Sequence, residues 1–146
     1  MFVTRIVTIF LFPLLATVAA AESDLAIEGY SPVSYFTEGE AQLGDPEFAA
    51  RHEGKLYYLT SREQLRMFEE SPEKFVPALG AHCPYSLSLG RTVAIDPERF
   101  KIIDGRLYLF HRSDELDALK AWNEADESER RGRLESAKSR FILMRF

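Results

Sequence analysis

Two short turn sequences, each followed by an aromatic-rich run, constrain most strongly what this chain can fold into. In residues 48–52 apolar side chains alternate up to the Glu53-Gly54 pair, and the strand-like residues 56–59 follow it. Asp104-Gly105, followed by Arg106, precedes residues 107–110, which are equally rich in apolar and aromatic side chains. A Gly-containing two-residue turn between such runs is typical of a β-hairpin, so the sequence predicts two hairpins.

The sequence before the Asp104-Gly105 turn carries further strand signals. Residues 92–95 and 100–103 are rich in β-branched and aromatic side chains, and Asp96-Pro97 separates them. Because proline and aspartate interrupt strands, two separate strands are expected there. Residues 25–36, which contain glycine and proline, are expected to form an extended segment bent by a turn.

Helix signals occur at several places. Ser61 followed by Gln64 has the spacing of a capping box, and Pro72 and Pro84 suit a first helical position. Ser113 is expected to open a C-terminal helical region, because Leu116, Leu119 and Trp122 follow it at helical spacing and a similar pattern covers residues 134–141. The predicted fold class is α+β: one small domain with two β-hairpins, short helices and a C-terminal helical region.

Residues 1–21 have the layout of a secretory signal peptide. A single charge at Arg5 precedes a short apolar run that contains Pro13, and small residues with Ala19 and Ala21 at the cleavage positions end the segment. The run is short for a membrane anchor, and nothing later in the sequence is apolar enough to cross a bilayer. We therefore expect a periplasmic or secreted protein with no integral membrane span after cleavage. Its parts would be a signal peptide (1–21), a domain (22–122) and a charged helical extension (123–146).

Composition narrows the function classes. The 146 residues include 18 Lys and Arg against 23 Asp and Glu, which gives a formal net charge of −5, so nucleic acid is not an expected partner. The hydrophobic share of 46% is enough for a globular core. Cys83 is the one cysteine, so no internal disulfide can form even in an oxidising compartment.

Six short segments between residues 25 and 122 follow one another in a characteristic order. They are residues 29–36 (Gly-Tyr-Ser-Pro-Val-Ser-Tyr-Phe), 55–58 (Lys-Leu-Tyr-Tyr) with Ser61, 72–75 (Pro-Glu-Lys-Phe), 80–85 (Gly-Ala-His-Cys-Pro-Tyr), 95–97 (Ile-Asp-Pro) and 104–109 (Asp-Gly-Arg-Leu-Tyr-Leu). In this order they resemble the exported bacterial branch of the YHS domain family.

The resemblance implies a small α+β module, and relatives attached to metal transporters suggest metal binding. In metal-associated relatives one cysteine follows the Pro-Val dipeptide and another follows the aromatic strand. The corresponding positions here are Ser34 and Thr60, so two thiolate ligands are missing. Ser31 replaces the usual aspartate, which removes a carboxylate as well.

Cys83 is the strongest candidate for a reactive or metal-binding side chain. If Pro84 begins a helix, Cys83 is its N-cap, where free backbone amides and the helix dipole favour a thiolate. A thiolate would bind a soft ion such as Cu(I), or act as a redox nucleophile. The alternative is that the sulfur is packed in the core, as free cysteines usually are.

His82 and His111 are the candidate helpers of Cys83 in a metal site. His82 is adjacent to Cys83 in sequence, and His111 follows the last predicted strand. Neither has a diagnostic metal-ligand spacing, and adjacent residues of a regular element point in different directions.

Three functional hypotheses follow. The first is an exported binding module, not an enzyme, that takes copper or another soft transition metal through Cys83 with His82 or His111. The second is a thiol-dependent redox enzyme that uses Cys83. The third is a structural or protein-interaction domain, in which the charged C-terminal helix is the candidate surface for a partner protein.

Overall fold

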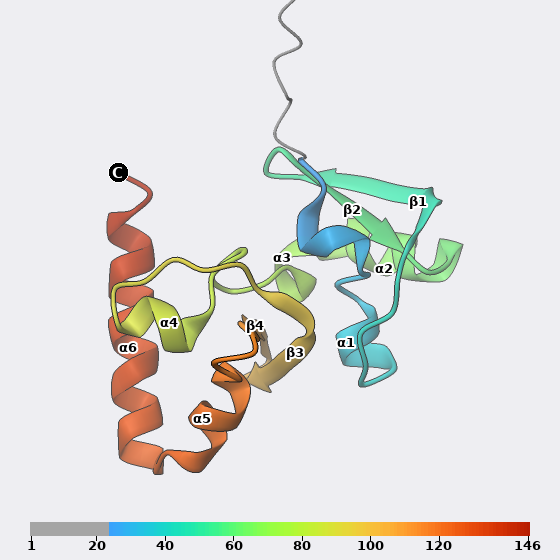
Figure 1. Cartoon of the computed structure of the whole chain (residues 1–146). Helices are drawn as coiled ribbons and strands as arrows, with labels where there is room; N and C mark the ends of the chain where they lie inside the picture. The colour runs from blue at the N-terminus through green and yellow to red at the C-terminus, as the bar shows by residue number, and fades with distance from the viewer. Residues whose placement is uncertain (1–23) are drawn as a thin grey trace, which may run out of the picture.

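The computed structural model describes residues 24–146, and Figure 1 shows their arrangement. The signal peptide predicted for residues 1–21 lies outside the described residues. Two separate two-stranded antiparallel sheets are surrounded by short helices, and one long helix, α6, runs along one side of the molecule. The predicted α+β fold with two hairpins and a C-terminal helical region is confirmed.

The first hairpin pairs β1 (Asp45–His52) with β2 (Lys55–Leu59). Its turn residues Glu53 and Gly54 have φ values of 46° and 78°, the left-handed conformation that a tight two-residue hairpin turn requires. The register shifts between Asp45 and Ala49, which marks a bulge near the start of β1.

The second hairpin pairs β3 (Asp96–Ile103) with β4 (Arg106–Phe110) across the Asp104-Gly105 turn. The expectation of two strands separated by Asp96-Pro97 is wrong: residues 91–95 have no regular structure, and β3 begins at Asp96 itself. Proline is tolerated there because it lies at the start of the strand, next to a register shift before Phe100. The carbonyl of Pro97 accepts a hydrogen bond from the hydroxyl of Tyr35 at 2.8 Å.

The N-terminal segment is more tightly wound than the sequence predicted. Instead of one extended run it forms η1 (Ala26–Gly29) and the short helix α1 (Ser34–Thr37). Helix α2 (Arg62–Glu70) begins as expected at Ser61, whose side chain accepts a hydrogen bond from the amide of Gln64 at 3.2 Å. Helix α3 (Pro72–Phe75) follows, with proline in its first turn.

The C-terminal half contains α4 (Pro84–Ser88), α5 (Ala118–Glu124) and α6 (Glu127–Leu143). Helix α5 begins at Asp117, its N-cap, and not at Ser113 as expected. The start is delayed because the chain first turns back on β4, where the amide of Ala118 donates to the carbonyl of His111 at 3.0 Å. Residues 122 and 123, between which the sequence suggested a boundary, both lie within α5.

The core lies between the two hairpins and the helices. Leu59 and Phe68 come from the first half of the chain, and Phe110 and Trp122 from the second, with the latter two rings 5.5 Å apart. Helix α6 packs on α4 and places Leu134 and Ala137 in the same core. None of the helices formed by residues 24–146 combines the length and the apolar character needed to cross a membrane.

Candidate functional site

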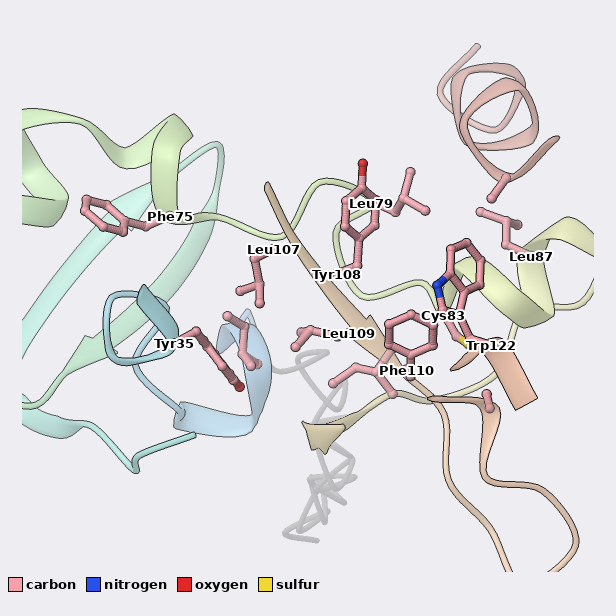
Figure 2. Close-up of a cluster of buried hydrophobic side chains, with 14 of the residues drawn as sticks. Tyr35, Phe75, Leu79, Cys83, Leu87, Leu107, Tyr108, Leu109, Phe110 and Trp122 are labelled. Carbon is pink, nitrogen blue, oxygen red and sulfur yellow. The ribbon is translucent and has the colours of Figure 1, made fainter. Parts of the chain in front are cut away.

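Cys83 is the N-cap of α4, as the sequence predicted. Its sulfur accepts a weak hydrogen bond from the amide of Ser86 at 3.5 Å, and Pro84 is the first helical residue. The side chain is only 1% exposed and belongs to the buried cluster that contains Leu87, Phe110 and Trp122 (Figure 2). Solutes therefore have no direct access to the sulfur in this conformation.

His82 lies at the surface side of the same loop. Its ring makes an edge-to-face contact with Phe141 of α6, with ring centroids 5.7 Å apart. Partial burial lowers the pKa of His82 below its ordinary value, because burial disfavours the charged imidazolium. The ring thus packs as a largely neutral aromatic group against the long helix.

His111 follows β4 and is held by the backbone of a distant loop. Its Nδ1 lies 2.7 Å from the carbonyl oxygen of Ala94. Because a carbonyl oxygen can only accept, Nδ1 carries the proton in this bond and Nε2 is the remaining nitrogen for a ligand.

The structure does not gather the three predicted ligands into one site. Within residues 24–146 no group of three or more His, Cys, Asp or Glu side chains is placed to hold a metal ion. A site on Cys83 would require the buried sulfur to become exposed and further donors to be supplied from elsewhere. Copper binding through Cys83, His82 and His111 therefore stays a prediction without a preformed ligand set among residues 24–146.

Ser34 and Thr60, the positions that the predicted resemblance would align with cysteines, lie at a largely buried polar network. The Ser34 hydroxyl donates to the carbonyl of Ser31 at 2.9 Å, and the Ser31 hydroxyl donates to Oε1 of Gln64 at 2.6 Å. The same Oε1 accepts from the amide of Thr60 at 3.2 Å. The hydroxyls of Ser31 and Ser34, the side chain of Gln64 and the backbone amide of Thr60 thus form one hydrogen-bonded network.

A cleft between the two hairpins, which we call the hairpin cleft, is the best-formed hollow near chemically useful groups. It consists of an inner cavity of about 120 Å³ and an adjoining outer hollow of about 340 Å³. Lys55 and Tyr57 line both parts. The walls of the inner cavity include Ile27, Lys55, Tyr57, Gly80, Ile95 and Leu109. Its lining is mainly apolar, and its size together with the outer hollow is in the range of roughly 300 to 1,000 Å³ usual for small-ligand sites.

Three cationic side chains line the hairpin cleft. Lys55 borders both parts, and Arg106 and Arg145 border the outer hollow. Among the described residues no carboxylate forms an ion pair with any of the three, although Arg145 lies over the ring of Phe141.

Two acids also border the outer hollow, Glu53 and Glu73, and Glu73 faces His52 at 3.9 Å. The three cations outnumber these two carboxylates. The cleft is therefore cationic in a chain whose formal net charge is −5.

Tyr57 supplies a further polar group to the cleft. The side chain is 7% exposed, and its hydroxyl makes no hydrogen bond within residues 24–146. Burial, and secondarily the charge of Glu53, raise the pKa of Tyr57, so the hydroxyl keeps its proton at neutral pH. Among residues 24–146 this hydroxyl is not one of the enclosed polar atoms that lack a partner, so it reaches solvent and can donate to water or to a ligand.

The other side of the cavity is formed by a strained backbone. Ile27 and Glu28 have φ values of 51°, and Gly29 follows at 85°. A β-branched residue rarely adopts this left-handed conformation, and such strain is concentrated at sites where geometry matters for function. The turn places Ile27 in the cavity wall.

Sequence reasoning did not identify the hairpin cleft. Lys55, Arg106 and Arg145 are far apart along the chain, and only the packing of the hairpins with α6 brings them to one hollow. Two features of the cleft did have local sequence signals: a turn glycine at Gly29 and an aromatic strand that contains Tyr57. These signals indicated secondary structure and not a binding site.

Comparison of the chain with protein-family models, with curated proteins and with solved structures gives no match in any of the three. The resemblance to the YHS domain family therefore stays a prediction that is based on the six ordered segments.

Proposed function

We propose that this chain is a non-enzymatic binding module, working outside the cytoplasm, that takes a small organic anion in the hairpin cleft. The single observation that carries the proposal is the set of three cations without carboxylate partners around a mainly apolar cavity. In an acidic chain, cations left without ion pairs at a concave site favour an anionic ligand.

The cleft has the groups needed to bind such a ligand. Lys55 borders both the cavity and the outer hollow, so its ammonium group suits the anionic head of the ligand. The hydroxyl of Tyr57 can donate a hydrogen bond to the same head, and Ile95 and Leu109 offer apolar surface to the rest of the molecule. The ligand class is thus a short aliphatic or aromatic carboxylate.

The copper and redox hypotheses receive less support from the geometry. Both hypotheses require that the sulfur of Cys83 is accessible to an ion or a substrate in solution, and that sulfur is buried with Phe110 and Trp122 in the core. Within the proposal Cys83 has a structural role, as the N-cap of α4 and as a core side chain.

Calorimetric titration of residues 22–146 with hexanoate, and with its uncharged counterpart hexanamide, tests the proposal. A ligand of this size is expected to bind in the millimolar range, because small ligands gain limited free energy per atom. We expect hexanoate to bind at least about tenfold more tightly than hexanamide, since only the carboxylate meets the cations, and this corresponds to about 1.4 kcal/mol.

Lys55→Gln is the test variant and Lys120→Gln the matched control, because Lys120 is an exposed lysine of α5 outside the cleft. Lys55→Gln should weaken the preference for hexanoate over hexanamide without abolishing it, because Arg106 and Arg145 still border the cleft, and Lys120→Gln should leave the preference as in the native chain. Equal affinities of the native chain for the acid and the amide, or a preference that Lys55→Gln leaves unchanged, would show that the cleft does not select anions.

A further inference from the structure

The end of α6 is unusual in charge for this protein. Residues 136–146 contain Lys138, Arg140 and Arg145 and no acidic residue, although the whole chain has a formal net charge of −5. Lys138 forms an ion pair with Glu135 at 2.9 Å, but Arg140 has no carboxylate partner within the described part of the chain. The last turns of the helix are therefore locally cationic.

The same end of the helix exposes large apolar side chains. Four of them are at least half exposed: Ile142, Leu143, Met144 and Phe146. Leu143 is 76% exposed. Figure 1 shows that the ribbon of α6 extends at this end past the loop that follows α4.

The loop after α4 adds to this surface. Leu89 is an exposed apolar residue there, and Arg91 is an exposed cation. The two elements lie against one another, because a Cβ at Gly90 would be 3.2 Å from Nη1 of Arg140. We call this surface the α6 tip: Leu89, Arg91, Arg140, Ile142, Leu143, Met144 and Phe146.

We infer that the α6 tip docks the protein on the surface of an anionic lipid bilayer. The cations suit the phosphates of the lipid headgroups, and the apolar side chains suit the boundary between headgroups and acyl chains. Arginine can keep its guanidinium group among the phosphates while its methylene stem lies in the apolar layer.

The geometry favours a lipid surface over a protein partner. Ile142 and Leu143 end α6 and Met144 is its C-cap, still with a right-handed helical backbone, so these consecutive residues point about 100° apart around the helix axis. A rigid protein face laid along the helix would cover one of these directions and leave the others in water. A fluid interface that the tip enters end-on surrounds all of them.

Cosedimentation with lipid vesicles tests the inference. Residues 22–146 are used because they contain every described element, whereas residues 1–21 are apolar and would bind lipid on their own account. Vesicles made of equal parts phosphatidylglycerol and phosphatidylcholine should bind the protein, and vesicles of phosphatidylcholine alone should bind it at least about fivefold more weakly. The difference should shrink at high salt, because salt screens surface charge.

Two pairs of variants locate the binding surface. Leu143→Ser should lower binding to the anionic vesicles about tenfold and Arg140→Gln about fivefold. Their matched controls are Leu43→Ser, at an exposed leucine that is 66% exposed near β1, and Arg62→Gln, at an exposed arginine of α2. The controls should bind as the native chain does.

Absent binding, equal binding to both vesicle types, or tip variants that bind as well as their controls would each overturn the inference. A change of oligomeric state on Leu143→Ser, with vesicle binding unaffected, would also overturn it and would identify the tip as a protein interface. Arg145 is left unchanged in these tests because it also borders the hairpin cleft.

Discussion

Replacing Cys83 by alanine should destabilise the protein measurably, because its sulfur is packed and caps a helix. The side chain is 1% exposed and lies in a cluster with Leu87, Phe110 and Trp122, so its removal leaves a void that the rigid rings around it fill poorly. The change also removes the acceptor for the amide of Ser86 at the start of α4.

The expected cost is about 2 kcal/mol. Loss of one buried group the size of a methylene accounts for about 0.8 kcal/mol, and the resulting cavity adds a comparable amount. The lost cap contributes about 0.5 kcal/mol, at the low end for helix caps, because a sulfur acceptor 3.5 Å from the amide is weak. For a domain of this size the change should lower Tm by about 8 °C.

Urea unfolding followed by the fluorescence of Trp122, the one tryptophan of the chain, measures this cost directly. Ser61→Ala is the matched control, since it removes the cap of α2 and leaves the core intact, and it should cost about 1 kcal/mol. In the folded native chain the thiol should resist Ellman's reagent, and it should react fully in urea.

A Cys83→Ala variant as stable as the native chain would refute this reasoning. So would a thiol that reacts in the folded protein at the rate of a free cysteine. The reactive thiol would show that the sulfur is accessible and would make the copper and redox hypotheses the leading ones.

Two further changes test the fold. Gly44→Ala should destabilise the first hairpin by about 1–3 kcal/mol, because the added Cβ would lie 2.5 Å from the carbonyl carbon of Tyr58. Circular dichroism should show this as a lower Tm, and an unchanged Tm would contradict the close approach of Gly44 to Tyr58. Burial raises the pKa values of Tyr35, Tyr57 and Tyr108, so these residues keep their protons in the folded state after their unfolded counterparts ionise at about pH 10. Stability should therefore be complete below that pH and fall as the pH rises above it, which urea midpoints and absorbance at 295 nm can follow; ionisation of every tyrosine near pH 10 without loss of stability would contradict it.

The hairpins were predictable because their signals are local. A two-residue turn needs left-handed backbone at its centre. Glycine adopts this conformation readily, so Gly54 and Gly105 indicate the turns in the sequence itself. The N-cap role of Cys83 was predictable for the same reason, since Pro84 beside it marks the start of a helix.

Features that depend on distant partners were not predictable. Pro97 was expected to interrupt a strand, but it lies inside β3, where its carbonyl is bonded by Tyr35 from 62 residues away. The burial of Cys83 likewise depends on Phe110 and Trp122, which come from a later strand and helix. No local pattern reports such packing.

The candidate site shows the same limit. Each of its cations was visible in the sequence, but nothing near Lys55 or Arg106 indicates that they border one cleft. Cys83, in contrast, was a candidate because it is the one cysteine of the sequence, and in the structure it is buried.

Amide chemical shifts during a titration with hexanoate test the central claim most directly, because they report where an organic anion binds. We expect progressive, saturable shifts for Ile27, Lys55, Tyr57 and Gly80, which surround the inner cavity, and none for the residues of α4 after Pro84. Shifts centred on α4, or no saturable shift in the walls of the cleft, would contradict it.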